Sequence, residues 1–202
     1  MLEALWDKAV QTLGGRPGTA GDLAARYAEP HRAYHDTDHV LAVARDVADL
    51  AAHRTERDRA VLTLAALAHD VVYDGRPGED ERNSAEWVRE RLEEAGVDPE
   101  PVVALVLATI DHTATDELTA LLMDADLAIL AADPEAYERY RQAVRREYAH
   151  VTDEAWRAGR GQVLESLHER DPLYRTPRAR ARWEARAKAN LAAELAGLSE
   201  LR

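Results

Sequence analysis

Cysteine is absent from this sequence of 202 residues. Its absence excludes a disulfide framework and a thiolate zinc site, so any bound metal ion must use His, Asp and Glu side chains. Long apolar runs are absent as well, and no stretch of about 18 apolar residues offers a membrane span. Together these absences indicate a globular protein with no membrane partner, whose metal chemistry would depend on imidazoles and carboxylates.

Positive charge is also scarce. The sequence has 26 Lys and Arg residues against 38 Asp and Glu residues, which gives a formal net charge of −12. The average field therefore repels polyanions, and we expect no nucleic acid polymer as a partner. The first residues lack the basic-then-apolar pattern of a secretion signal, so we expect a cytoplasmic location. A monomer and a homodimer are both open.

Apolar residues recur with helical spacing through most of the chain, and alternating strand-like runs are missing. This pattern predicts an all-α fold, a single-domain helical bundle of nine or ten helices over residues 1–202. Its core should span about residues 20–195, with an N-terminal helix over residues 2–13 packed on it.

One predicted helix is apolar on most of its sides and should therefore be central. It opens at Thr55 and is expected to end near Tyr73. The next helix, residues 79–95, is charged and typical of a surface helix. Before the central helix, Asp36 or Thr37 can cap another one.

The eight histidines are unevenly placed. His53, His150 and His168 lie in charged surroundings, as surface histidines do. The doublet His69-Asp70 instead follows the apolar run of the central helix. Burial of a carboxylate without a partner costs several kcal/mol, so a metal ion or another cation is expected beside it.

Two other apolar helices direct a metal-competent residue toward the core. His39 shares a stripe with Val43 and Val47, and Asp126 lies one turn from Leu122 and Ile129. From the residues alone, two interpretations stay open: a metal site, and a buried His–Asp hydrogen-bond network.

The order H…HD…D, with its flanking residues, resembles the HD-domain superfamily of metal-dependent phosphohydrolases. More closely, the sequence is similar to a small bacterial branch of predicted metal-dependent HD phosphohydrolases. The resemblance covers about residues 20–195, and its most similar stretches are residues 27–35 (YAEPHRAYH), 68–74 (AHDVVYD), 124–130 (DADLAIL), 173–177 (LYRTP) and 189–191 (ANL).

The resemblance implies an all-helical fold around one or two divalent ions, with Mn, Mg, Co, Ni, Fe and Zn all open. The implied ligands are His39, His69, Asp70 and Asp126. Asp124 is a rival for the last position. Only one of the two aspartates can be a ligand, because residues two apart on a helix point about 200° away from one another and cannot both face one ion. Asp126 is favoured, since it follows Ala125 in the Ala-Asp pair common in the superfamily.

The resemblance also implies a reaction, in which a metal-activated water attacks the phosphorus of a small phosphorylated molecule. The usual substrates of the family suggest that the substrate is a nucleotide or a related phosphomonoester. Asp70 and Asp74 are the catalytic candidates. Several HD hydrolases carry a Glu-Asp pair just beyond the doublet, where this sequence has Tyr73-Asp74. Asp74 is either a general acid or base, or a loop-capping residue.

Candidate contacts to a substrate phosphate are His35, Arg32, His112 and Arg175. The alternatives are a helix-entry hydrogen bond for His35, a second metal for His112 and plain surface charge for Arg175. The start of the helix that contains Glu81 and Ser84 can bind an anion or be a solvated first turn.

Two other functions remain open from the sequence. Some HD-fold proteins use a di-iron centre for oxygenase chemistry, and His112 would add a ligand for a second ion. A non-catalytic sensor of nucleotides or metal is favoured by the missing Glu at position 73.

Overall fold

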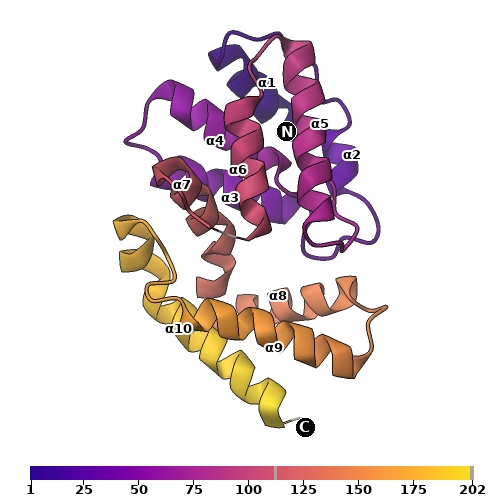
Figure 1. Cartoon of the computed structure of the whole chain (residues 1–202), viewed down its shortest axis with the longest axis vertical. Helices are drawn as coiled ribbons and strands as arrows, with labels where there is room; N and C mark the ends of the chain where they lie inside the picture. Colours follow the sequence, from indigo (N-terminus) through magenta and orange to yellow (C-terminus); the bar gives the residue numbers. More distant parts are fainter. Residues whose placement is uncertain (112, 201–202) are drawn as a thin grey trace. The chain divides into compact units, whose positions relative to one another are not determined.

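The computed structural model describes residues 1–111 and 113–200, and all regular secondary structure in this part is helical (Figure 1). It contains ten α-helices and two short 3-10 helices, which confirms the predicted all-α class. Within the described residues, no helix has both the length and the apolar character needed to cross a membrane.

The chain divides into two compact units, Met1–Asp126 and Leu127–Arg202. The prediction of a single domain over residues 1–202 stays a prediction. The helices of the first unit are α1 (Leu2–Thr12), α2 (Leu23–Tyr27), α3 (Thr37–Leu50), α4 (Glu56–Ala68), α5 (Glu79–Ala95), α6 (Glu100–Leu107), the 3-10 helix η1 (Ala108–Ile110) and α7 (Glu117–Asp126).

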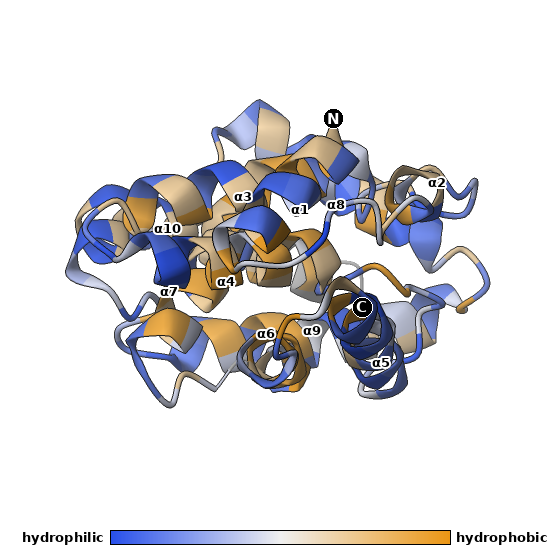
Figure 2. Ribbon diagram, turned by 90° about the horizontal axis from the view of Figure 1, so that it is seen from above, coloured by the Kyte–Doolittle hydropathy of each residue, from blue (hydrophilic) through white to orange (hydrophobic). Residues whose placement is uncertain are grey.

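Helix α4 is the centre of the first unit, as its sequence predicts. It packs against α1, α3, α5, α6 and α7, and nearly every residue from Ala60 to Ala68 is buried. Burial of each large apolar side chain contributes about 1.5–3 kcal/mol. Figure 2 shows the contrast with α5, which is coloured mostly as hydrophilic, as expected for a surface helix.

Side-chain caps determine where the site-bearing helices begin. The Asp36 carboxylate accepts hydrogen bonds from the backbone N–H groups of Asp38 and His39, so Asp36 rather than Thr37 is the N-cap of α3. Thr55 caps α4 in the same way. His39 therefore lies in the first turn of α3, in a fixed position.

The predicted end of the central helix is wrong. Helix α4 stops at Ala68, and the chain leaves helical structure at His69-Asp70 instead of continuing to Tyr73. The last helical backbone bond runs from His69 N–H to the Ala65 carbonyl. Side chains from outside the helix bind the carbonyls that follow, so the backbone is satisfied without further helical turns.

The second unit contains η2 (Leu127–Ala131), α8 (Pro134–Glu147), α9 (Asp153–Glu169) and α10 (Pro177–Glu200). Helix α10 packs on α9 and on η2. A buried ion pair joins α9 to α10, with Arg160 Nε 2.8 Å from Glu194 Oε1. The Tyr137 hydroxyl of α8 donates to the same carboxylate at 2.6 Å. A shared buried carboxylate thus connects the three long helices of this unit.

Candidate metal centre

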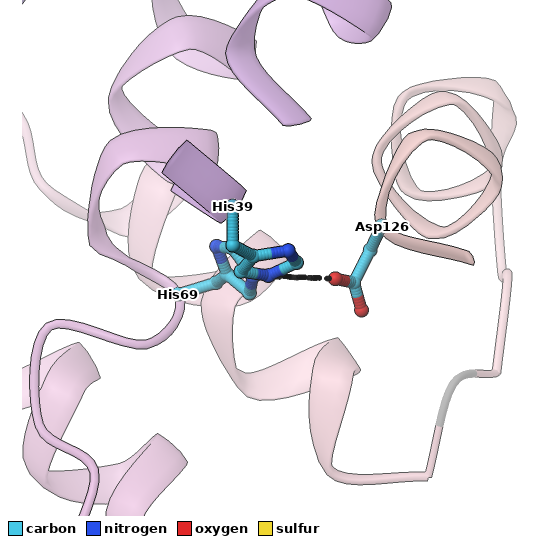
Figure 3. Close-up of side chains that lie close together, drawn as sticks. All are labelled: His39, His69 and Asp126. Carbon is cyan, nitrogen blue, oxygen red and sulfur yellow. Dashed lines mark hydrogen bonds and ion pairs between the residues drawn. The ribbon is translucent and has the colours of Figure 1, made fainter. Parts of the chain in front are cut away.

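Three elements of the first unit bring their polar side chains together at one point. His39 comes from the first turn of α3, His69 from the end of α4 and Asp126 from the last position of α7. In Figure 3 both imidazole rings lie beside the Asp126 carboxylate. The Nε2 atoms of the two histidines are 3.4 Å apart. Each Nε2 atom is also 3.4 Å from Asp126 Oδ1.

Asp70 adds a second carboxylate to this group. Its Oδ2 atom is 3.1 Å from His69 Nε2 and 3.4 Å from His39 Nε2. The histidines are only 7% and 2% exposed, whereas the side chains of Asp70 and Asp126 are 18% and 15% exposed. The imidazoles therefore form the buried side of the group and the carboxylates its solvent side.

Hydrogen bonding of His69 indicates which of its nitrogens can bind a metal. The Nδ1 atom lies 3.0 Å from the Ala66 carbonyl oxygen. A carbonyl can only accept, so Nδ1 carries the proton, and in the neutral ring Nε2 has a free lone pair. That lone pair faces carboxylate oxygens, which are also acceptors. A cation or an added proton must lie among them, and the donor set of two imidazoles and two carboxylates fits a divalent ion.

The pKa values of these groups describe the metal-free state. Burial by itself would lower the pKa of His69, but the Asp70 and Asp126 carboxylates outweigh it and raise that pKa well above its usual value. The pKa of His39 is raised for the same reason, against the same effect of burial. Burial would raise the pKa of Asp70, yet the neighbouring histidines hold it well below its usual range. The protonated histidines and the ionised Asp70 therefore stabilise one another when no metal is bound.

Between the two rival carboxylates, the structure brings Asp126 to the histidines. One ligand atom each from His39, His69 and Asp126 lies within 4.8 Å of the others, and such a group could hold a metal ion. Asp124 is 1% exposed and lies two residues earlier on α7, on a different side of the helix. This arrangement agrees with the predicted preference, and the role of Asp126 as a ligand stays a prediction.

Aromatic side chains line the edge of the group. The ring of His35 stacks on that of Tyr73, with centroids 4.1 Å apart. The centroids of His35 and Tyr34 lie 5.5 Å and 4.7 Å from that of His39. All three edge residues are half-buried. His35 is thus next to the candidate centre, where a phosphate contact is feasible, and that contact stays a prediction.

Arg32 has a different place from the one predicted for a phosphate contact. Its side chain is 0% exposed, and its guanidinium donates to the backbone carbonyls of His35, Asp70 and Val71. A buried guanidinium bound to protein carbonyls is not available to a substrate. The sequence does not reveal that Arg32 binds backbone carbonyls, because an arginine beside a predicted site is equally compatible with a phosphate ligand.

The loop after the doublet is held by the start of α5. The Asp80 carboxylate accepts from the N–H groups of Asp74 and Arg76 at 3.0 and 2.8 Å. Ser84 is fully buried, and its hydroxyl accepts from the N–H of Val72 at 3.0 Å. Asp80 therefore caps the loop, and Ser84 binds the backbone rather than an anion. The Asp74 side chain is exposed on this loop.

Two further residues were predicted to contact a substrate phosphate. His112 falls outside the described residues. Arg175 is an exposed residue of the second unit, before α10. The phosphate contacts predicted for both stay predictions.

Paired substitutions test the choice of carboxylate. Asp126→Asn should lower the affinity for Mn²⁺ more than Asp124→Asn, because Asp126 Oδ1 lies 3.4 Å from the Nε2 atoms of both histidines. Replacement of a residue outside the ligand shell typically lowers metal affinity by about 10–100-fold. For Asp126→Asn we expect a larger loss of Mn²⁺ affinity. Isothermal titration of the metal-free variants measures both affinities. The reverse order would show that Asp124 is the ligand.

The pH dependence of metal binding follows from the raised histidine pKa values. In the metal-free protein, the stabilisation from protonated His69 is complete below the usual histidine pKa of 6.5 and is lost as pH rises through the higher folded pKa. Metal binding needs neutral histidines, so it strengthens over the same range. The rise in Tm on adding Mn²⁺ should therefore be greater at about pH 8 than at about pH 5.5. A rise that is equal at both values, or greater at the lower one, would contradict this assignment.

Comparison with known proteins agrees with this geometry. The family model described as "HD domain" matches residues 37–153, more than half of the chain. No curated protein and no solved structure matches the chain significantly. Proteins of the matched family are generally metal-dependent phosphohydrolases, and the matched residues include the group that could hold a metal ion. The chain therefore belongs to the HD domain family.

Proposed function

We propose that this protein is a divalent-metal-dependent phosphohydrolase that acts on a small phosphorylated substrate, a nucleotide or a related phosphomonoester. The observation that carries the proposal is the convergence of two buried imidazoles with the carboxylates of Asp70 and Asp126. Membership of the HD domain family supports the reaction class.

The donor set determines what the site can do. His39, His69, Asp70 and Asp126 would hold a divalent ion, which would supply Lewis-acid activation of a water molecule and of a phosphoryl oxygen. The two carboxylates would offset part of its positive charge. Asp74 lies on the loop just beyond Asp70, exposed to solvent. Its carboxylate is the candidate for transferring a proton to or from the water or the leaving group.

The substrate class rests on charge and on resemblance. A formal net charge of −12 disfavours polyanionic nucleic acids and leaves small phosphorylated molecules as the better substrates. His35 is a proposed phosphate contact, supported by its place at the edge of the metal group, where its ring centroid is 5.5 Å from that of His39. His112 and Arg175 are further proposed contacts. The restriction to nucleotides and related monoesters comes from the resemblance to the bacterial HD branch.

A second candidate is a sensor that binds a metal ion and a nucleotide without turnover. The observation in its favour is Tyr73, which occupies the position where several HD hydrolases carry Glu. Its ring stacks on His35 instead of offering a carboxylate for proton transfer.

Metal analysis followed by a phosphatase screen distinguishes these functions. The purified protein should contain at least one divalent ion per chain. It should release phosphate from a nucleotide or sugar phosphate with Mn, Mg, Co or Ni. His69→Ala should lose metal and turnover together, whereas His53→Ala should keep both, because His53 is 60% exposed and pairs with Glu117.

Other outcomes of that screen have definite meanings. Nucleotide binding without phosphate release under any of the ions would replace the hydrolase with the sensor. Iron in the purified protein, together with oxygen consumption, would instead indicate oxidative chemistry. Full metal occupancy in His69→Ala would refute the assignment of the site.

Substitution of Asp74 separates catalysis from metal binding. Asp74→Asn should lower kcat by about 10²–10⁴-fold, the usual contribution of a general acid or base, with unchanged metal content. The metal should remain because the described ligand group does not include Asp74. Arg76→Gln, on the same loop and exposed, is the matched control and should keep kcat. Unchanged turnover in Asp74→Asn would remove Asp74 from the reaction.

A further inference from the structure

The backbone that carries the His69-Asp70 doublet loses its helical hydrogen bonds just where the candidate ligands begin. Side chains from residues 27–32 bind the carbonyls of this exit. The Tyr27 hydroxyl donates to the Leu67 carbonyl at 3.1 Å. His31 Nε2 lies 2.7 Å from the Tyr73 carbonyl oxygen. Residues 27–32, which are distant in sequence, thus bind the backbone at both ends of the segment from Leu67 to Tyr73.

Arg32 contributes the central contacts of this cap. Its Nη1 atom donates to the Asp70 carbonyl at 2.7 Å, and its Nη2 atom donates to the Val71 carbonyl at 3.0 Å. The same Nη1 atom also donates to the His35 carbonyl at 3.0 Å. One guanidinium group therefore connects the backbone of the doublet to the backbone just before α3, the helix that carries His39.

The orientation of that guanidinium is itself fixed. Its Nε atom donates to Glu29 Oε2 at 3.1 Å. The rings of Tyr27 and Tyr73 lie 5.1 and 5.7 Å from its central carbon atom, within the range of cation–π contacts. These groups hold the side chain in one plane, buried from solvent.

We propose that Arg32 is a positioning residue that sets the His69-Asp70 ligand pair relative to His39. This inference rests on the proposed metal site. Arg32 acts through backbone carbonyls, so it touches neither the ion nor the substrate. Both sides of the candidate centre depend on it, because His35 leads into α3 and Asp70 is itself a candidate ligand.

The chemistry of the position calls for arginine. Three carbonyls and one carboxylate need several N–H donors in a planar fork, which a guanidinium supplies. A lysine at this position has a single ammonium group on a flexible chain and cannot reach all four acceptors. The loop beyond the doublet has independent support on its amide side, from Asp80 and Ser84. Loss of Arg32 should therefore loosen residues 70 and 71 more than the loop that follows.

The test measures metal affinity and backbone exchange, and does not depend on catalytic activity. Mn²⁺ alone is titrated into metal-free wild type, Arg32→Met and Arg32→Lys. We expect Arg32→Met to lower the Mn²⁺ affinity by about 10–100-fold, the usual cost of losing support outside the ligand shell. Arg32→Lys should recover only part of that loss. Hydrogen exchange of peptides covering residues 67–74 should speed up in Arg32→Met.

Arg91→Met is the matched control. Arg91 is another arginine of the first unit; it is half-buried, pairs with Asp22 and lies 5.0 Å from the Trp87 ring centroid. Its loss removes two ion pairs, with Asp22 and Glu90, and a ring contact, and it leaves the metal group untouched, so Mn²⁺ affinity should not change. Addition of methylguanidinium to Arg32→Ala should restore part of the affinity, which a general loss of stability would not allow.

Each result has a definite meaning. Wild-type Mn²⁺ affinity in Arg32→Met would overturn the inference. Absence of Mn²⁺ binding in the wild type would refute the metal site, not the role of Arg32. In that case the exchange measurement decides, and unchanged exchange of residues 67–74 in Arg32→Met would overturn the positioning role. If Arg32→Met does not fold, Arg32→Lys replaces it. Unchanged affinity and exchange in Arg32→Lys would overturn the inference as well.

Discussion

The end of helix α4 is the constraint on which the first unit depends. This helix is buried on nearly all sides, and it ends in a histidine and an aspartate that are also largely removed from water. Buried polar groups need partners, and charged ones need opposite charge. The other elements supply them. Helices α3 and α7 bring His39 and Asp126 to the doublet, and residues 27–32 bind its backbone.

The candidate metal group consists of four side chains, and other side chains hold the backbone around it in place. Two imidazoles and two carboxylates face one another, an arrangement that only protons or a cation can stabilise. Around them, the irregular residues 69–78 are ordered by side chains from two directions. Arg32 and His31 bind carbonyls on one side, whereas Asp80 and Ser84 bind amides on the other. A segment without regular structure can thus hold ligands in a defined place.

Sequence reasoning succeeded where the signal is local. Periodicity identified α4 as central, and capping chemistry located the starts of α3 and α4 near Asp36 and Thr55. The stripe that contains His39 and the turn that contains Asp126 predicted that both residues face the same core. The prediction from the sequence failed at the end of α4. Helical periodicity continues past Ala68, but the partners of the carbonyls there come from residues distant in the chain. The function of Arg32 was missed for the same reason.

The sequence by itself determined the all-α class, the central helix and the set of metal-competent residues, because helical period and residue chemistry are written along the chain. It could not choose between a metal group and a hydrogen-bond network, nor assign Arg32 to the backbone instead of a phosphate. Tertiary structure decided the convergence of Asp126 with the two histidines and the burial of Arg32. Such outcomes depend on distances between segments separated by tens of residues, and no local pattern records those distances.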